Sequence, residues 1–199
     1  MTEADRNNNP EEIGKEINRL TGKLLSLGRI DVLLHAITFP VLEELHIEAA
    51  RGRLSPLRIT RDYHFILTSK GREIELQPVH KAVYLLFLAH PEGIEFKRLT
   101  DYRSELVAMY RNVAPAMEIE KIEESVSHLV NPLDNAINEK CSRIKKAFMS
   151  IMDEYSAGYY IISSHTKRHV AGSNRIWYER LKVVTLPREL IIREDLTEQ

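Results

Sequence analysis

The spacing of apolar residues near the start of the chain predicts two helices. Over residues 10–28, apolar side chains recur every three or four positions, which places them on one face of a helix opened by proline and ended by glycine. These residues are Ile13, Ile17, Leu20 and Leu24. A second apolar helix is expected from about residue 30 to residue 48, kinked near Pro40. Two short helices cannot bury this much apolar surface between them, so we expect residues 10–50 to form a helical hairpin that mediates a homodimer.

Strand-like patterning follows. Residues 58–68 alternate loosely between polar and apolar side chains, and a tight turn at 69–72 leads into a second short strand at 73–76, so we expect a small hairpin. One more short strand is expected at 94–96. Apolar residues at helical spacing predict three helices in the same region, over about 78–89, 97–110 and 118–130.

The most informative pattern is an amphipathic basic helix predicted over residues 132–149, with Asn131 as its N-cap and Pro132 in its first turn. Its apolar stripe consists of Ile137, Cys141, Ile144 and Phe148. Its outer face and flanks carry Asn135, Lys140, Ser142, Arg143, Lys145 and Lys146. Directly after this helix, residues 155–162 predict a short hairpin around Gly158. A basic helix beside a hairpin suits a reader of the DNA major groove, and the same pattern also fits an ordinary solvated surface helix.

The last part of the chain leaves its secondary structure open. Residues 175–182 fit a helix about as well as a strand, and Pro187 separates them from a short apolar piece at 190–192. Lys167 and Arg168 form a short basic cluster that could face phosphates or lie in a polar surface loop.

Composition limits the class of protein. With 199 residues, of which 43% are hydrophobic and 29% charged, the chain has material for one domain and an accessory segment, and we expect it to be soluble and cytoplasmic. The net charge is only −1, but residues 139–182 contain nine Lys or Arg and four Asp or Glu, which concentrates positive charge there. The single cysteine excludes an intramolecular disulfide, and the longest apolar run, over 83–89, is too short to span a bilayer.

Five short motifs, in order, resemble the winged-helix output domain of OmpR/PhoB-type response regulators. They are Leu76-Gln77-Pro78, then the apolar helix Ala82 to Leu88 with His90-Pro91-Glu92-Gly93-Ile94, Lys97-Arg98-Leu99, Ser142-Arg143-Ile144-Lys145-Lys146, and Gly158-Tyr159. The last two are similar to the recognition helix and the wing turn of that family. The match covers residues 58–163, and it implies a winged helix-turn-helix that binds double-stranded DNA.

The chain also departs from that family. Residues 1–57 are too short for a phosphoacceptor receiver domain, and the wing turn lacks the arginine of the family. Glu139 lies on the exposed face of the basic helix, where it would repel phosphate. The acidic helix over 118–130 enlarges a region that can touch RNA polymerase in the family, so this helix could dock RNA polymerase or another protein; a solvated surface helix is the alternative.

We therefore expect an α+β, mostly helical protein built as a winged helix-turn-helix with an N-terminal helical hairpin. The expected division is a helical segment at 1–57, a winged-helix domain at 58–163 and an extension at 164–199. The expected function is a DNA-binding transcriptional regulator, and the alternative is a winged-helix protein-interaction module. The expected DNA-contacting residues are Asn135, Lys140, Ser142, Arg143, Lys145, Lys146, Lys167 and Arg168. The sequence contains no motif of an enzyme, a metal site or a cofactor site, so we expect none of these.

Overall fold

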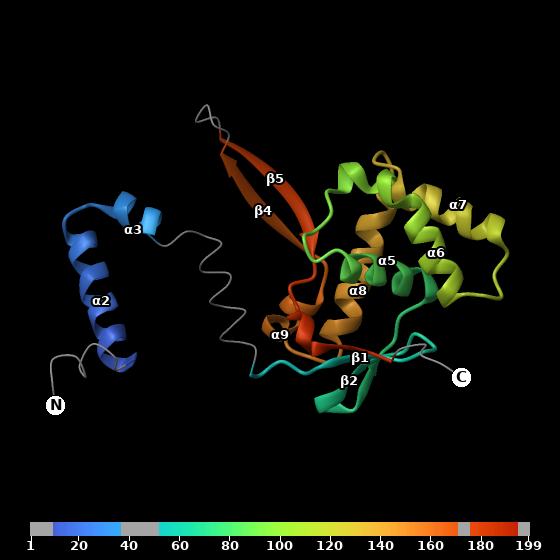
Figure 1. The fold of residues 1–199 in the computed structure, drawn as a ribbon, viewed down its shortest axis with the longest axis horizontal. Helices are drawn as coiled ribbons and strands as arrows, with labels where there is room; N and C mark the ends of the chain where they lie inside the picture. Colours follow the sequence, from blue (N-terminus) through green and yellow to red (C-terminus); the bar gives the residue numbers. More distant parts are fainter. Residues whose placement is uncertain (1–9, 37–51, 171–175, 195–199) are drawn as a thin grey trace. The chain divides into compact units, whose positions relative to one another are not determined.

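A computed structural model of the chain describes residues 10–36, 52–170 and 176–194, without the side chains of 167–170 and 176–178. Contacts within the chain divide it into two compact units, residues 1–49 and 50–199, and each is described by itself. The larger unit has the mostly helical α+β character expected from the sequence (Figure 1).

The first unit contains helices α2 (Pro10–Ser26) and α3 (Ile30–Ala36), as the apolar spacing predicts. Gly28 adopts a left-handed conformation (φ 68°) between them, and the Arg29 amide donates to the carbonyl of Leu24 at 2.9 Å. Neither helix contains a buried residue, and Ile13, Ile17 and Leu20 are about half exposed, which leaves the apolar face of α2 uncovered within the described residues. The rest of the predicted second helix, including Pro40, lies outside the described residues.

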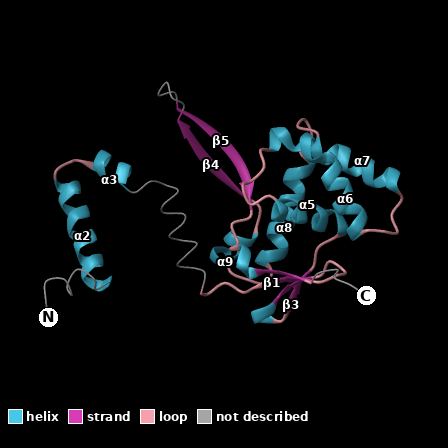
Figure 2. Ribbon diagram, in the orientation of Figure 1, coloured by secondary structure: helices cyan, strands magenta, loops and turns pink. Residues whose placement is uncertain are grey.

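A four-stranded mixed sheet forms one end of the larger unit (Figure 2). Strands β1 (Leu57–Ile59), β2 (Phe65–Leu67) and β3 (Arg72–Ile74) run antiparallel, and β6 (Ile191–Arg193) pairs parallel with β1. The predicted hairpin around residues 69–72 is confirmed by β2 and β3, with a 3₁₀ turn, η1 (Thr68–Lys70), before β3. The single strand predicted over 58–68 is wrong, because a turn divides it into β1 and β2. Because β6 joins β1, residues 191–193 complete the same sheet that residues 57–74 begin.

The helices pack around α5 (Pro78–Ala89), in which eight of twelve residues are buried. A 3₁₀ segment, η2 (Phe96–Tyr102), leads into α6 (Arg103–Val113), and α7 (Ile119–Val130) follows. Both α6 and α8 (Ala136–Met149) contact α5. The predicted strand at 94–96 is reduced to a single bridge between Ile94 and Lys182.

The basic helix begins later than the sequence predicts. Asn131 is not its N-cap, because its side-chain oxygen accepts from the amide of Leu133 and forms a local turn, as Asp134 does with the amide of Ala136. Helix α8 therefore starts at Ala136, with Asn135 in the N-cap position.

The predicted hairpin at 155–162 is wrong. Residues Glu154–Tyr160 form a short helix, α9, in which the Asp153 carboxylate caps the helix by accepting from the Ser156 amide at 2.9 Å. The two-stranded hairpin comes later, as β4 (Ser163–Val170) and β5 (Ile176–Val183), and extends away from the helices in Figure 1. The segment whose secondary structure the sequence leaves open is thus a strand from Ile176 onward, and a 3₁₀ turn, η3 (Arg188–Leu190), precedes β6.

Candidate nucleic-acid interface

Helix α8 is fixed in the core by one face. Ile137, Ile144 and Phe148 are buried, each contributing roughly 1.5–3 kcal/mol by leaving water. The ring of Phe148 stacks on Tyr160 of α9 with centroids 5.6 Å apart and lies 5.3 Å from the ring of Tyr84 of α5. The stripe predicted from the sequence is confirmed for these three residues, and Cys141 is partly buried beside them. Because this face is held on two sides, the opposite face of α8 must point outward.

The outward face carries basic side chains that differ in their availability. Arg143 and Lys146 are exposed, and neither forms an ion pair within the described residues. Lys145 lies 3.7 Å from a carboxylate oxygen of Glu154, and Lys140 lies 3.8 Å from one of Glu139. Arg143 and Lys146 are therefore the two cations of α8 most available to an external anion.

The polar residues predicted for this site are engaged locally. The Ser142 hydroxyl donates to the carbonyl of Asn138 at 2.9 Å, and the Asn135 side-chain oxygen accepts from the Asn138 amide group at 3.0 Å. Both residues are exposed on the same helix as the cations. Their remaining hydrogen-bonding capacity faces solvent, so they can still contact a ligand after these local bonds are made.

The positive charge of this region affects the pKa of a buried histidine under α8. His80 of α5 is buried, and its Nε2 atom has no hydrogen-bond partner among the described residues. Burial first, and then the charges of Lys140 and Arg143, lower the pKa of His80. The ring thus stays neutral at neutral pH, and the cations above it are not compensated from below. Local sequence patterns carry no signal for this arrangement, because His80 is 60 or more positions from both cations.

The β4–β5 hairpin is anchored at its base next to the helices. Ile94 and Lys182 exchange two backbone hydrogen bonds of 2.9 Å, and the Lys182 ammonium lies 5.1 Å from the ring centroid of Phe96. Gly93 (φ 85°) allows this contact, since a Cβ atom there would come within 3.0 Å of the Leu181 Cβ atom. The hairpin base is therefore held rigidly, close to the start of the 3₁₀ segment that leads into α6.

Two of the predicted DNA-contacting residues lie on this hairpin and not on α8. Lys167 and Arg168 belong to β4, opposite Glu179 and Tyr178 of β5, so the polar loop considered from the sequence is instead a strand. Their side chains lie outside the described part of the structure. Arg180 of β5 is exposed and adds a described cation to the hairpin.

Helix α7 presents a negatively charged surface, in contrast to the positively charged face of α8. Its apolar residues Ile122, Val126 and Leu129 are buried, whereas Glu120, Glu123 and Glu124 are exposed. An acidic face repels nucleic acid, so α8 and not α7 has the charge of a groove reader. Docking of RNA polymerase or another protein on α7 stays a prediction.

The described residues show few features of a metal site, a reactive thiol or a membrane-spanning helix. Groups of three or more His, Cys, Asp or Glu placed to hold a metal ion are absent from this part of the chain. Burial raises the pKa of the Cys141 thiol to about 12, so it carries no thiolate at neutral pH. None of the described helices has the length and apolar character needed to cross a membrane.

Comparison with protein-family models, with curated proteins and with solved structures found no match to this chain. The resemblance to the OmpR/PhoB output domain accordingly stays a prediction from short motifs. Its placement of the wing turn at Gly158-Tyr159 is wrong, because both residues lie in α9.

Proposed function

We propose that this protein is a transcriptional regulator that binds double-stranded DNA, with α8 in a major groove and the β4–β5 hairpin beside it as the wing of a winged helix. The observation that supports this proposal most is the two-sided character of α8. One face is fixed in the core by Phe148, and the other presents Arg143 and Lys146, which form no ion pair with any residue that the structure describes. A rigid helix with available cations meets the geometric and electrostatic needs of groove binding.

The side chains of α8 take different roles in this proposal. Arg143 reads a guanine through two hydrogen bonds from its guanidinium group, because its fork geometry matches the O6 and N7 acceptors. Lys146 contacts phosphate, and Lys140 and Lys145 contribute less because carboxylates already lie near them. On the hairpin, Lys167 and Arg168 of β4 contact the DNA phosphate backbone beside the groove.

The direct test is a titration of the full chain with mixed genomic DNA fragments at several salt concentrations. Binding should weaken steeply as salt rises, because lysine and arginine displace condensed counterions. Arg143→Ala should cost about 1–3 kcal/mol on the preferred site and relax specificity there. Lys146→Gln should weaken all sequences alike and lower the salt slope by about one. Glu139→Gln should strengthen non-specific binding by removing a repulsive charge.

A matched control is available on β3. Arg72 is exposed like Arg143 but lies in the sheet, so Arg72→Gln should leave DNA binding unchanged. If no fragment binds at low salt, or if Arg72→Gln and Arg143→Ala weaken binding equally, the DNA proposal fails. A winged-helix protein-interaction module would then take its place.

A further inference from the structure

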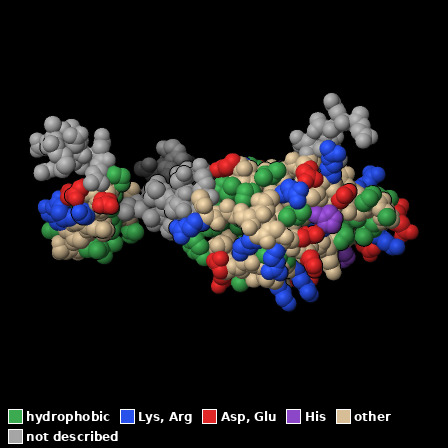
Figure 3. Space-filling view, turned by 90° about the horizontal axis from the view of Figure 1, so that it is seen from below, with side chains coloured by type: hydrophobic (Ala, Val, Ile, Leu, Met, Phe, Trp, Pro, Cys, Tyr) green, Lys and Arg blue, Asp and Glu red, His purple; other side chains and the backbone are tan. Residues whose placement is uncertain are grey.

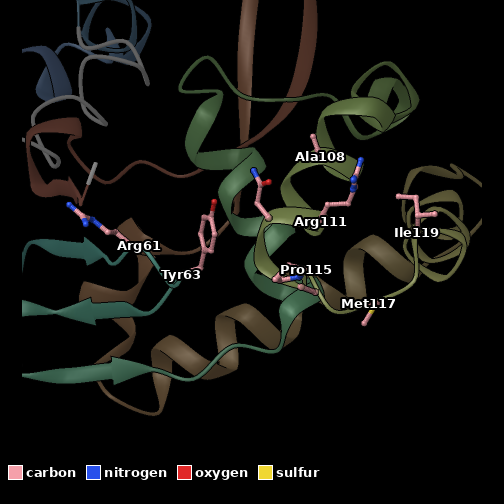
Figure 4. Close-up of a pocket in the computed structure, with 9 residues that line it drawn as sticks. Arg61, Tyr63, Ala108, Arg111, Pro115, Met117 and Ile119 are labelled. Atoms are coloured by element: carbon pink, nitrogen blue, oxygen red, sulfur yellow. The ribbon is translucent and has the colours of Figure 1, made fainter. Parts of the chain in front are cut away.

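A cavity of about 750 Å³ lies between the turn that joins β1 to β2 and the C-terminal half of α6 (Figure 4). Small-molecule sites in proteins typically measure roughly 300–1,000 Å³, so this volume suits a metabolite. Three separate parts of the chain form it: the turn, the end of α6, and the loop that leads into α7. Its lining residues are Arg61, Tyr63, Ala108, Arg111, Asn112, Ala114, Pro115, Met117 and Ile119.

The lining of this cavity is basic and apolar. It contains two guanidinium groups, from Arg61 and Arg111, and no Asp or Glu. Arg111 is exposed and forms no ion pair within the described residues. Of the acidic residues next to the lining residues along the chain, Glu118 pairs with Lys121 at 2.8 Å, and Asp62 is exposed to solvent. An anion beside Arg111 would therefore meet a guanidinium group, and the residues that line the cavity contribute no carboxylate to compete with it.

One aromatic side chain, Tyr63, lines the cavity on the side of the β1–β2 turn. Tyr63 is the only described non-glycine residue with a positive φ, at 58°, and the turn holds it there through a 2.9 Å bond from its amide to the carbonyl of Thr60. Such a conformation costs on the order of 1 kcal/mol or more and persists where the surrounding structure fixes it. Figure 4 shows the Tyr63 ring between the turn and α6, with Arg111 extending from that helix. Pro115 and Met117 supply apolar surface nearby.

We propose that this cavity binds a small organic anion, whose carboxylate or phosphate group pairs with Arg111 and whose apolar body lies against Tyr63, Pro115 and Met117. A guanidinium group forms two parallel hydrogen bonds with either anion, which gives both affinity and orientation. The apolar wall gives preference to an organic anion over inorganic phosphate. This site is separate from α8, and its occupation does not depend on DNA binding.

The test uses calorimetric titration of the full chain, without DNA, with 1-naphthoate and 1-naphthyl phosphate as probes and neutral 1-naphthamide as their control. Both anions should bind saturably with one site per chain, and about tenfold or more tighter than the amide. Arg111→Gln should weaken both anions by about tenfold or more and leave the amide unchanged. Met117→Ala should weaken all three probes, because it removes apolar surface that they share.

Arg72→Gln again serves as the control, since it removes an exposed arginine at the opposite end of the sheet from the β1–β2 turn. It should bind the anions as the unmodified chain does. Equal affinity for the amide and the anions would overturn the proposal, as would unchanged anion binding in Arg111→Gln or the absence of saturable binding up to millimolar probe. Thermal unfolding of each variant confirms that it is folded, and Arg111 is exposed, so its loss should not affect folding.

Discussion

Two buried tyrosine hydroxyl groups form hydrogen bonds in the core beside α8, and their contribution to stability can be measured. Tyr84 of α5 donates to the backbone carbonyl of Tyr160 at 2.7 Å, and Tyr160 donates to the carbonyl of Ser55 at 2.6 Å. Both side chains are at most 1% exposed. These bonds connect α5 to α9 and α9 to the segment before β1, and the Phe148 ring of α8 packs between the two tyrosine rings.

Replacing Tyr84 with Phe removes one hydroxyl group and almost no packing volume. Because the bond is buried, the carbonyl of Tyr160 loses a donor that water does not readily replace, so we expect a loss of about 1–3 kcal/mol in the free energy of unfolding. Tyr160→Phe should lose a similar amount. For a chain of this size, each kcal/mol lowers the melting temperature by roughly 2–4 °C.

Urea unfolding followed by circular dichroism measures these losses, and Tyr155→Phe provides the matched control. Tyr155 is 62% exposed, and its hydroxyl accepts a long hydrogen bond of 3.3 Å from the Tyr159 hydroxyl, so removing this hydroxyl should change the free energy of unfolding by no more than about 0.5 kcal/mol. If Tyr84→Phe and Tyr160→Phe prove as stable as Tyr155→Phe, the two hydroxyl groups do not hold α8 in place. The apolar packing of Ile137, Ile144 and Phe148 would then be what fixes α8.

Two further predictions concern pH and assembly. Burial alone would lower the pKa of His90, but the hydrogen bonds that its ring makes to the carboxylates of Glu105 and Glu92 outweigh burial and raise this pKa. The stabilisation is therefore full below the unfolded pKa of about 6.5 and is lost as pH rises through the folded value. In urea unfolding, His90→Gln should thus destabilise the chain more at pH 5.5 than at pH 8.5. Figure 3 shows apolar side chains of α2 and α3 at the surface, and we expect α2 to pair with a second copy of the chain. Sedimentation at tens of micromolar should therefore give a dimer. Ile17→Asp should convert this dimer to a monomer, whereas the control Asn18→Asp should not. Equal destabilisation by His90→Gln at both pH values would contradict the pH prediction. A monomeric unmodified chain would contradict the prediction of a dimer.

Much of the helical structure could be predicted because its signals are local. The buried residues Ile137, Ile144 and Phe148 lie at helical spacing in α8, and spacing is set by neighbours within a few positions. The start of α8 was misplaced for a local reason as well. Asn131 and Asp134 bond to amides two positions ahead, and such turns use the same residue types as an N-cap.

The candidate site was predicted only in part. The basic residues from Lys140 to Lys146 do share one helix, as expected, because a single periodicity places them. The hairpin beside them was assigned to the wrong segment, since Tyr159 and Tyr160 suggest strands but are buried within α9. Strand β4 is polar along most of its length and lacks the alternation that marks a half-buried strand, so no local signal identified it.

The parallel pairing of β6 with β1 constrains the order in which the larger unit can fold during synthesis. Arg58 and Glu194, which form an ion pair of 2.8 Å at this junction, are 136 residues apart. Closing a loop of that length costs on the order of 4 kcal/mol in chain entropy. The three residue pairs between β1 and β6 cannot offset this cost alone. The helices between them must therefore assemble first and bring the two strands together. Until residue 193 has left the ribosome, β1 remains an open sheet edge exposed to other nascent chains.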